Sequence, residues 1–120
     1  MKPAWRLPVV APLAMPTLVL GALALGTLVF ATSVPARAAN IQISVENLEF
    51  SPVNATAKVG DTVEWVNKDV LAHTATAQNG DWDVMLPPKK SGTVVLKKAG
   101  TVDYYCRFHP NMKATLTVAP

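Results

Sequence analysis

The chain has 120 residues, of which 11 are lysine or arginine and 8 are aspartate or glutamate, so its formal net charge is +3 at pH 7. Lys2, Arg6 and Arg37 are the only basic residues before position 39, and every acidic residue follows it, so residues 39–120 carry eight charges of each sign. This balance gives no electrostatic argument for nucleic-acid binding, and the single cysteine excludes an internal disulfide bond.

The first 38 residues have the pattern of a secretory signal peptide. A short basic segment, Met1–Arg6, precedes a long apolar stretch that runs from Leu7 to Ala31. A proline and two small residues, Ala36 and Ala38, follow in a small-x-small arrangement. The pattern predicts cleavage after Ala38, which would leave 82 residues, enough for one domain.

The alternative for this segment is an uncleaved membrane anchor. A spanning helix needs about 20 residues. Prolines at positions 8, 12 and 16 interrupt the apolar stretch and leave only Thr17–Ala31 as a continuous run. Cleavage is therefore favoured, and we expect an exported, periplasmic protein, with a membrane-anchored protein facing the periplasm as the alternative.

The first half of the remaining chain predicts two strands with turns between them. Ile41–Val45 alternates apolar and polar side chains, and Phe50 is expected to cover the core where the chain turns. The Gly60-Asp61 turn leads into a strand at Thr62–Asn67, with Val63 and Trp65 on one face. A loop is expected at residues 68–72.

The second half continues in the same way. Residues 74–77 can form a strand, Asn79-Gly80 marks a turn, and a short apolar segment ends at Pro87-Pro88. Further strands are predicted at residues 91–97, 101–105 and 113–118. Because no segment after residue 38 has a sustained helical period, the pattern predicts an all-β sandwich.

The only cysteine lies in a loop with a histidine and a methionine at three-residue steps. Cys106 follows the predicted strand, and His109 and Met112 complete a Cys-x2-His-x2-Met arrangement in which Pro110 restricts the turn. A lone cysteine or methionine usually packs in a core, but this spacing favours metal ligation. Thiolate, imidazole and thioether donors suit copper better than magnesium or calcium. With the remaining histidine, His73, they make the ligand set of a blue-copper electron-transfer site.

These residues resemble the C-terminal copper loop of the cupredoxin (type 1 blue copper) family, with a spacing most similar to amicyanin, pseudoazurin and plastocyanin. The segment Val59–Asn67, followed by His73, is similar to the strand and loop that supply the first histidine. The resemblance covers roughly residues 41–118. Many cupredoxins have asparagine directly after that histidine, whereas this chain has Thr74. The resemblance therefore leaves open which group braces the two ligand segments.

The resemblance implies a Greek-key β-sandwich over residues 39–120. It also implies one copper ion, held by His73, Cys106, His109 and Met112 and cycling between Cu(II) and Cu(I) to carry single electrons. No open coordination position remains for a substrate, so we expect no enzyme activity. The expected partners are redox proteins as electron donor and acceptor, such as a c-type cytochrome, a dehydrogenase or a reductase. A monomer is expected, with membrane contact only if the leader stays uncleaved.

Other interpretations stay open at this point. A periplasmic copper carrier or storage protein would use the same ligands for delivery, and a structural or adhesion sandwich would bind no metal. Met85 is a rival axial ligand, but it lacks the loop spacing. Apolar residues are also expected to form either a docking rim beside His109 or ordinary loop packing: Leu71, Leu86, Pro87, Pro88, Phe108 and Pro110.

Overall fold

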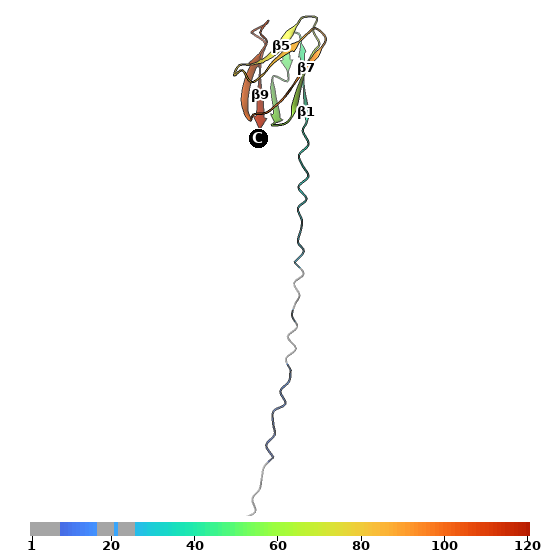
Figure 1. Cartoon of the computed structure of the whole chain (residues 1–120), viewed down its shortest axis with the longest axis vertical. Coiled ribbons are helices and arrows are strands. Elements are labelled where there is room, and N and C mark those ends of the chain that lie inside the picture. Colours follow the sequence, from blue (N-terminus) through green and yellow to red (C-terminus); the bar gives the residue numbers. More distant parts are fainter. Residues whose placement is uncertain (1–7, 17–20, 22–25) are drawn as a thin grey trace, which may run out of the picture. The chain divides into compact units, whose positions relative to one another are not determined.

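The computed structural model describes residues 8–16, 21 and 26–120 (Figure 1). The predicted basic segment Met1–Arg6 and much of the apolar run Thr17–Ala31 lie outside the described residues. The chain divides into a unit of Met1–Ser33 and a unit of Val34–Pro120. Within the described ranges, no helix has the length and apolar character needed to cross a membrane.

The second unit is a β-sandwich of two sheets, which confirms the predicted fold class (Figure 1). One sheet has the strand order β2-β1-β4-β7 and the other has the order β3-β9-β8-β5-β6. The strands found in the described residues are β1 (Asn40–Glu46), β2 (Glu49–Ser51), β3 (Asn54–Lys58), β4 (Thr62–Asn67), β5 (His73–Ala77), β6 (Asp83–Leu86), β7 (Ser91–Val95), β8 (Gly100–Tyr105) and β9 (Lys113–Ala119).

Two strand pairs are parallel and bring together distant parts of the sequence. β1 pairs with β4, so that Ile43 lies beside Trp65, and β3 pairs with β9, so that Ala55 lies beside Leu116. The remaining pairs are antiparallel. In the second sheet β9 lies between β3 and β8, so the last strand of the chain joins the sheet together.

The core fills the space between the sheets and is tightest around four aromatic rings. The ring of Tyr104 on β8 lies 4.8 Å from Phe50 and 5.7 Å from Trp65, and Trp65 lies 5.0 Å from Trp82. Such pairs contribute about 0.5–1.5 kcal/mol each beyond the burial of their area. These contacts join β4 to β8, the strands that precede the two predicted ligand segments.

Two strands were not expected from the sequence. β2 is short, and β3 presents only Ala55 and Ala57 to the core, so its hydrophobic alternation is weak. Both strands form because a neighbouring strand offers an edge with which to pair. The strand predicted at residues 91–97 is shorter than expected and ends at Val95.

Gly92 marks the place where the edges of the two sheets approach each other. A Cβ atom at this position would lie 2.9 Å from Leu86 Cδ2 and 3.1 Å from the Met85 carbonyl oxygen, and it would clash with Val84. The clash involves strand β6, whose Leu86 pairs with His73. The close approach of β7 to β6 therefore depends on the missing side chain.

We predict that Gly92→Ala lowers the free energy of unfolding by about 1–3 kcal/mol, because overpacking forces neighbouring atoms to move. Urea denaturation of the metal-free protein measures the effect. Ser91→Ala, at the exposed neighbouring position, is the matched control and should change stability little. Equal stabilities for the two variants would contradict the prediction.

Candidate metal centre

His73 is the first residue of β5 and is completely buried. The loop that leads to it is held by the buried side chain of Asn67 at the end of β4. The Asn67 amide nitrogen donates to the carbonyl oxygens of Leu71 (2.8 Å) and Leu86 (3.0 Å), and its side-chain oxygen accepts from the Asp69 N–H (2.9 Å). Asn67 therefore fixes the approach of the chain to His73, a function that the sequence alone did not reveal.

Asp69 orients the His73 ring through Nε2, the ring nitrogen that does not face Cys106 and His109. Its Oδ2 atom lies 2.7 Å from His73 Nε2, and its carboxylate also accepts from the N–H groups of Asn47 (2.9 Å) and Leu48 (3.3 Å). Burial raises the pKa of Asp69, but the Asn47 N–H, His73 and the Leu48 N–H together hold the pKa below its usual value. Since the carboxylate accepts the Nε2 hydrogen, the lone pair of His73 lies on Nδ1, which faces the site.

The second ligand segment is a tight loop between β8 and β9. Cys106 is completely buried, and its N–H donates to the Met112 carbonyl oxygen at 3.1 Å. The Met112 N–H donates to the His109 carbonyl oxygen at 2.8 Å. These two bonds fold the seven residues of the loop back on themselves, with His109 partly exposed and Met112 buried.

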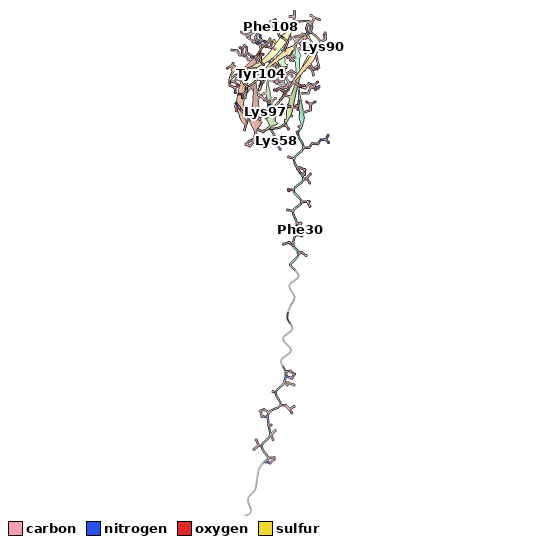
Figure 2. The ribbon with its side chains drawn as sticks, in the orientation of Figure 1. Phe30, Lys58, Lys90, Lys97, Tyr104 and Phe108 are labelled. Atoms are coloured by element: carbon pink, nitrogen blue, oxygen red, sulfur yellow. The ribbon has the colours of Figure 1, made fainter. Side chains whose placement is uncertain are left out.

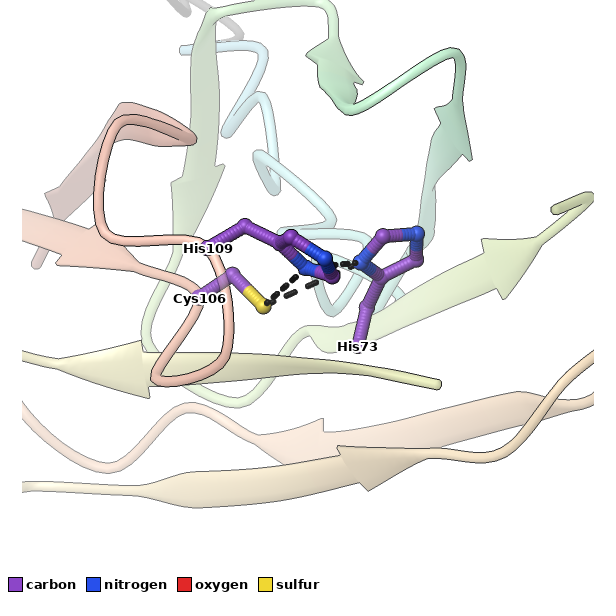
Figure 3. Close-up of side chains that lie close together, drawn as sticks. All are labelled: His73, Cys106 and His109. Carbon is purple, nitrogen blue, oxygen red and sulfur yellow. Dashed lines mark hydrogen bonds between the residues drawn. The ribbon is translucent and has the colours of Figure 1, made fainter. Parts of the chain in front are cut away.

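Three of the predicted ligands converge on one point (Figure 3). The Nδ1 atoms of His73 and His109 are 3.2 Å apart, and Cys106 Sγ lies 3.8 Å and 3.7 Å from them. Bonds of about 2.0 Å to nitrogen and 2.3 Å to sulfur, as zinc makes, would place N and S about 3.7 Å apart at a trigonal angle. The donor atoms therefore already have the separations that a small transition-metal ion requires.

The two methionines of the folded domain differ in their surroundings. Met112 is 3% exposed and belongs to the buried cluster that contains Cys106. Met85 on β6 pairs in register with Thr74, but its side chain is 50% exposed on the outer face of the sheet. Met112 therefore lies inside the domain in the same cluster as Cys106, whereas Met85 faces solvent. With two imidazoles and a thiolate, a thioether completes a soft donor set that fits copper.

Thr74 connects the two ligand segments. Its N–H donates to Cys106 Sγ at 3.3 Å, and its hydroxyl accepts from the Arg107 N–H at 2.8 Å. A hydrogen bond to sulfur stabilises the thiolate form, which is the form that binds metal. Thr74 is therefore the residue that links the two ligand segments. Its hydroxyl group takes the place of the asparagine side-chain amide that many cupredoxins have at this position.

The brace continues outward to the surface. The Thr74 hydroxyl lies 2.9 Å from the Thr76 hydroxyl, which donates to Asp83 Oδ1 at 2.7 Å, and Arg107 Nε donates to the same carboxylate oxygen at 3.2 Å. The Thr76 hydrogen bond is the main cause that holds the pKa of Asp83 below its usual value, and Arg107 adds to it. The Thr76 hydroxyl donates its hydrogen to Asp83, so it accepts the hydrogen of the Thr74 hydroxyl. The Thr74 oxygen can therefore accept the hydrogen bond from the Arg107 N–H.

We predict that Thr74→Val, which keeps the side-chain shape, lowers the stability of the metal-free protein by about 1–3 kcal/mol, because the Arg107 N–H loses its acceptor. Thr74→Ser keeps the hydroxyl and should retain most of the stability. Thr93→Val on the exposed face of β7 is the control for added apolar surface. Urea denaturation compares the three, and a Val variant as stable as the Ser variant would refute the brace.

Comparison with known proteins agrees with this geometry. A family model described as a cupredoxin-like domain matches residues 18–118. Amicyanin from Paracoccus versutus is 30% identical over 96 residues, which cover 75% of this chain and 71% of the relative. The methylamine utilization protein MauL from Methylorubrum extorquens is 30% identical over 91 residues, which cover 72% of this chain and 80% of the relative.

Solved structures show the same likeness. The crystal structure of the Paracoccus versutus amicyanin has a TM-score of 0.58 and 29% identity, covering 72% of this chain and 85% of that one. A reduced Cu(I) form of an amicyanin variant has a TM-score of 0.58 and 26% identity, covering 66% of this chain and 81% of that one. The family model spans more than half of the sequence and agrees with the sandwich and with the His–Cys–His cluster. The chain therefore belongs to the cupredoxin-like family.

Proposed function

We propose that this protein is a blue-copper electron-transfer protein and that His73, Cys106, His109 and Met112 hold its single copper ion. The observation that carries the proposal is the convergence of two imidazole nitrogens and one thiol sulfur within 3.8 Å of one another. The ion supplies one-electron chemistry by alternating between Cu(II) and Cu(I). The two histidines and the cysteine come from β5 and from the loop between β8 and β9, so the fold itself brings them together.

The chain's own residues keep the site rigid. Asp69 holds the ring of His73, the Thr74 N–H points at Cys106 Sγ, and the loop that carries His109 is closed by two backbone hydrogen bonds. Electron transfer between two oxidation states is favoured when the ligands move little. A ligand set held by β5, β8 and β9 meets that requirement, and copper relatives of the amicyanin group support the assignment.

We further propose that electrons pass through the partly exposed edge of His109. Phe108 is 48% exposed and Leu71 is 50% exposed, and Pro110 is exposed as well, so an apolar docking surface is available. Phe108 lies at one end of the domain (Figure 2). Leu86, one of the residues expected to form either a rim or ordinary loop packing, is completely buried, so it belongs to the packing and not to the surface.

The proposed partners are redox proteins that give and take single electrons at this apolar surface. The likeness to a methylamine utilization protein supports a dehydrogenase among them. Residues 1–38 are proposed to be an export leader that is removed after Ala38, which places the folded domain in the periplasm. This compartment is where a lone cysteine gains protection from oxidation by binding a metal.

The visible spectrum tests the function directly. Copper(II) added to the wild-type protein should give an intense charge-transfer band from the thiolate, which dithionite bleaches and reoxidation restores without loss of metal. Cys106→Ser should fold but lack the band, because no sulfur donor remains. A Cys106→Ser variant that keeps the colour would sink the assignment, and metal release on every reduction cycle would indicate delivery rather than electron transfer.

The axial position gives a separate prediction. Met112→Leu should keep the copper bound and coloured but raise the reduction potential, because a soft donor to Cu(II) is removed while the buried volume is kept. Voltammetry of the copper-loaded protein measures the shift. Met85→Leu is the matched control and should leave the potential unchanged, since that side chain faces solvent. A larger shift for Met85→Leu would reverse the assignment.

A further inference from the structure

Hydrogen bonding to the sandwich begins, among the described residues, at Ala39. The Ala39 N–H donates to Asp61 Oδ1 at 2.8 Å, and its carbonyl oxygen accepts from the Thr62 N–H at 2.9 Å. Residues 34–38 are exposed and belong to no strand. The first backbone nitrogen held by the folded domain is thus the one directly after Ala38, where the sequence pattern predicts cleavage.

Asp61 is a buried carboxylate built into this end of the sandwich. Its side chain is 5% exposed, and its second oxygen, Oδ2, accepts from the Lys58 N–H at 2.8 Å. Its backbone carbonyl accepts from the Leu96 N–H at 2.9 Å, so the residue joins the ends of β3, β4 and β7. The Ala39 and Lys58 hydrogen bonds hold the pKa of Asp61 below its usual value. A charged oxygen therefore points at the Ala39 nitrogen.

We propose that the peptide bond between Ala38 and Ala39 is a processing site and that Asp61 is the acceptor for the α-ammonium group that cleavage creates. The inference rests on the proposed export leader and adds the residue that receives the new terminus. A signal peptidase would hydrolyse the bond: one water molecule adds across it, leaving a carboxyl group on Ala38 and an amino group on Ala39. At neutral pH that amino group takes up a proton.

Cleavage at this bond changes a neutral contact into an ion pair without moving the partners. The amide N–H of the precursor becomes an ammonium group beside a buried carboxylate. Hydrogen bonds between charged groups are roughly twice as strong as neutral ones. Removing the leader should therefore tighten the start of β1, so that processing stabilises the domain that it releases.

The pH dependence follows from the two groups of the pair. Asp61 raises the pKa of the new amino group above its ordinary value of about 7.7–8.0, so the added stability is present below that range and is lost as the pH rises through the raised pKa. On the acid side it is lost as the pH falls through the lowered pKa of Asp61. Two other basic groups stay near the pair after cleavage: Lys58, whose charge lowers the pKa of Asp61, and Lys97, which follows Leu96. The nearby acidic group is Glu64, whose carboxylate accepts a hydrogen bond from Asn40. Arg37 is removed together with the leader.

The pair lies far from the proposed copper site, which allows a clean test. Lys58, whose N–H contacts Asp61, lies at the end of the domain opposite Phe108 (Figure 2). A change at Asp61 should therefore leave the copper spectrum intact. Loss of the spectrum in the wild-type protein would count against the proposed function, whereas a failure of the ion pair in a coloured protein would count only against this inference.

The experiment starts from the full-length chain, exported by a bacterial host. Intact-mass measurement of the released protein should show a terminus at Ala39. A second full-length chain carries a Gly-Ser insertion between Ala38 and Ala39, so that processing at the same place leaves Ala39 as an ordinary amide. Asp61→Asn is made in both chains, and Asp103→Asn, on the exposed face of β8, is the matched control.

Urea denaturation at pH 6.5 then compares the four combinations. Asp61→Asn should raise the unfolding equilibrium constant about tenfold more in the chain that begins at Ala39 than in the inserted chain, because only in the former does it remove a charged partner of an ammonium group. The excess should disappear at pH 10, and Asp103→Asn should show none at either pH. Equal effects of Asp61→Asn in the two chains, or a mature terminus elsewhere than Ala39, would overturn the proposal.

Discussion

The hydrogen bond from the Arg107 N–H to the Thr74 hydroxyl is the contact on which the site depends, because it joins two segments that are 33 residues apart. One segment carries His73 and the other carries Cys106, His109 and Met112. Besides this link, the two segments are connected by the weak N–H contact to sulfur, by the hydrogen bonds that run from Thr76 through Asp83 to Arg107, and by the short pairing of β5 with β8. The Thr74–Arg107 hydrogen bond thus helps to set the spacing between His73 and the donors of the loop.

The supports around His73 show how one buried polar side chain can organise several others. Asn67 holds the loop, Asp69 is held in turn by Asn67, and Asp69 holds both the imidazole and the turn at Asn47 and Leu48. Both turn residues have positive φ angles, of 53° and 63°, which is unfavourable for a leucine. The carboxylate that orients His73, a proposed ligand, thus also secures a strained turn whose Leu48 lines one pocket with His109.

Much of the fold and of the site could be predicted from local patterns. The alternation in Ile41–Val45 and Thr62–Asn67 indicated strands because one face of each is buried, and the three donors of the loop lie within seven residues of one another. His73 followed because it is the only other histidine. By contrast, β3 and the supports at Asn67, Asp69 and Thr74 act through partners far away in the sequence. The choice between rim and packing for Leu86 could not be made from the sequence for the same reason, since its burial depends on the place of β6 in the second sheet.

The order of the strands determines when a chain of this kind can first hold a metal ion. Three of the four proposed donors come late in the sequence, and the strand that follows them, β9, is the one that lies between β3 and β8. A growing chain that lacks β9 has a divided second sheet, because β9 is the strand that pairs with both β3 and β8. Parallel pairs such as β3 with β9 also form slowly, because their ends are far apart along the chain. We therefore expect a chain that lacks β9 to bind copper poorly, because the loop that carries Cys106 and His109 then has no strand on its far side to pair with β8.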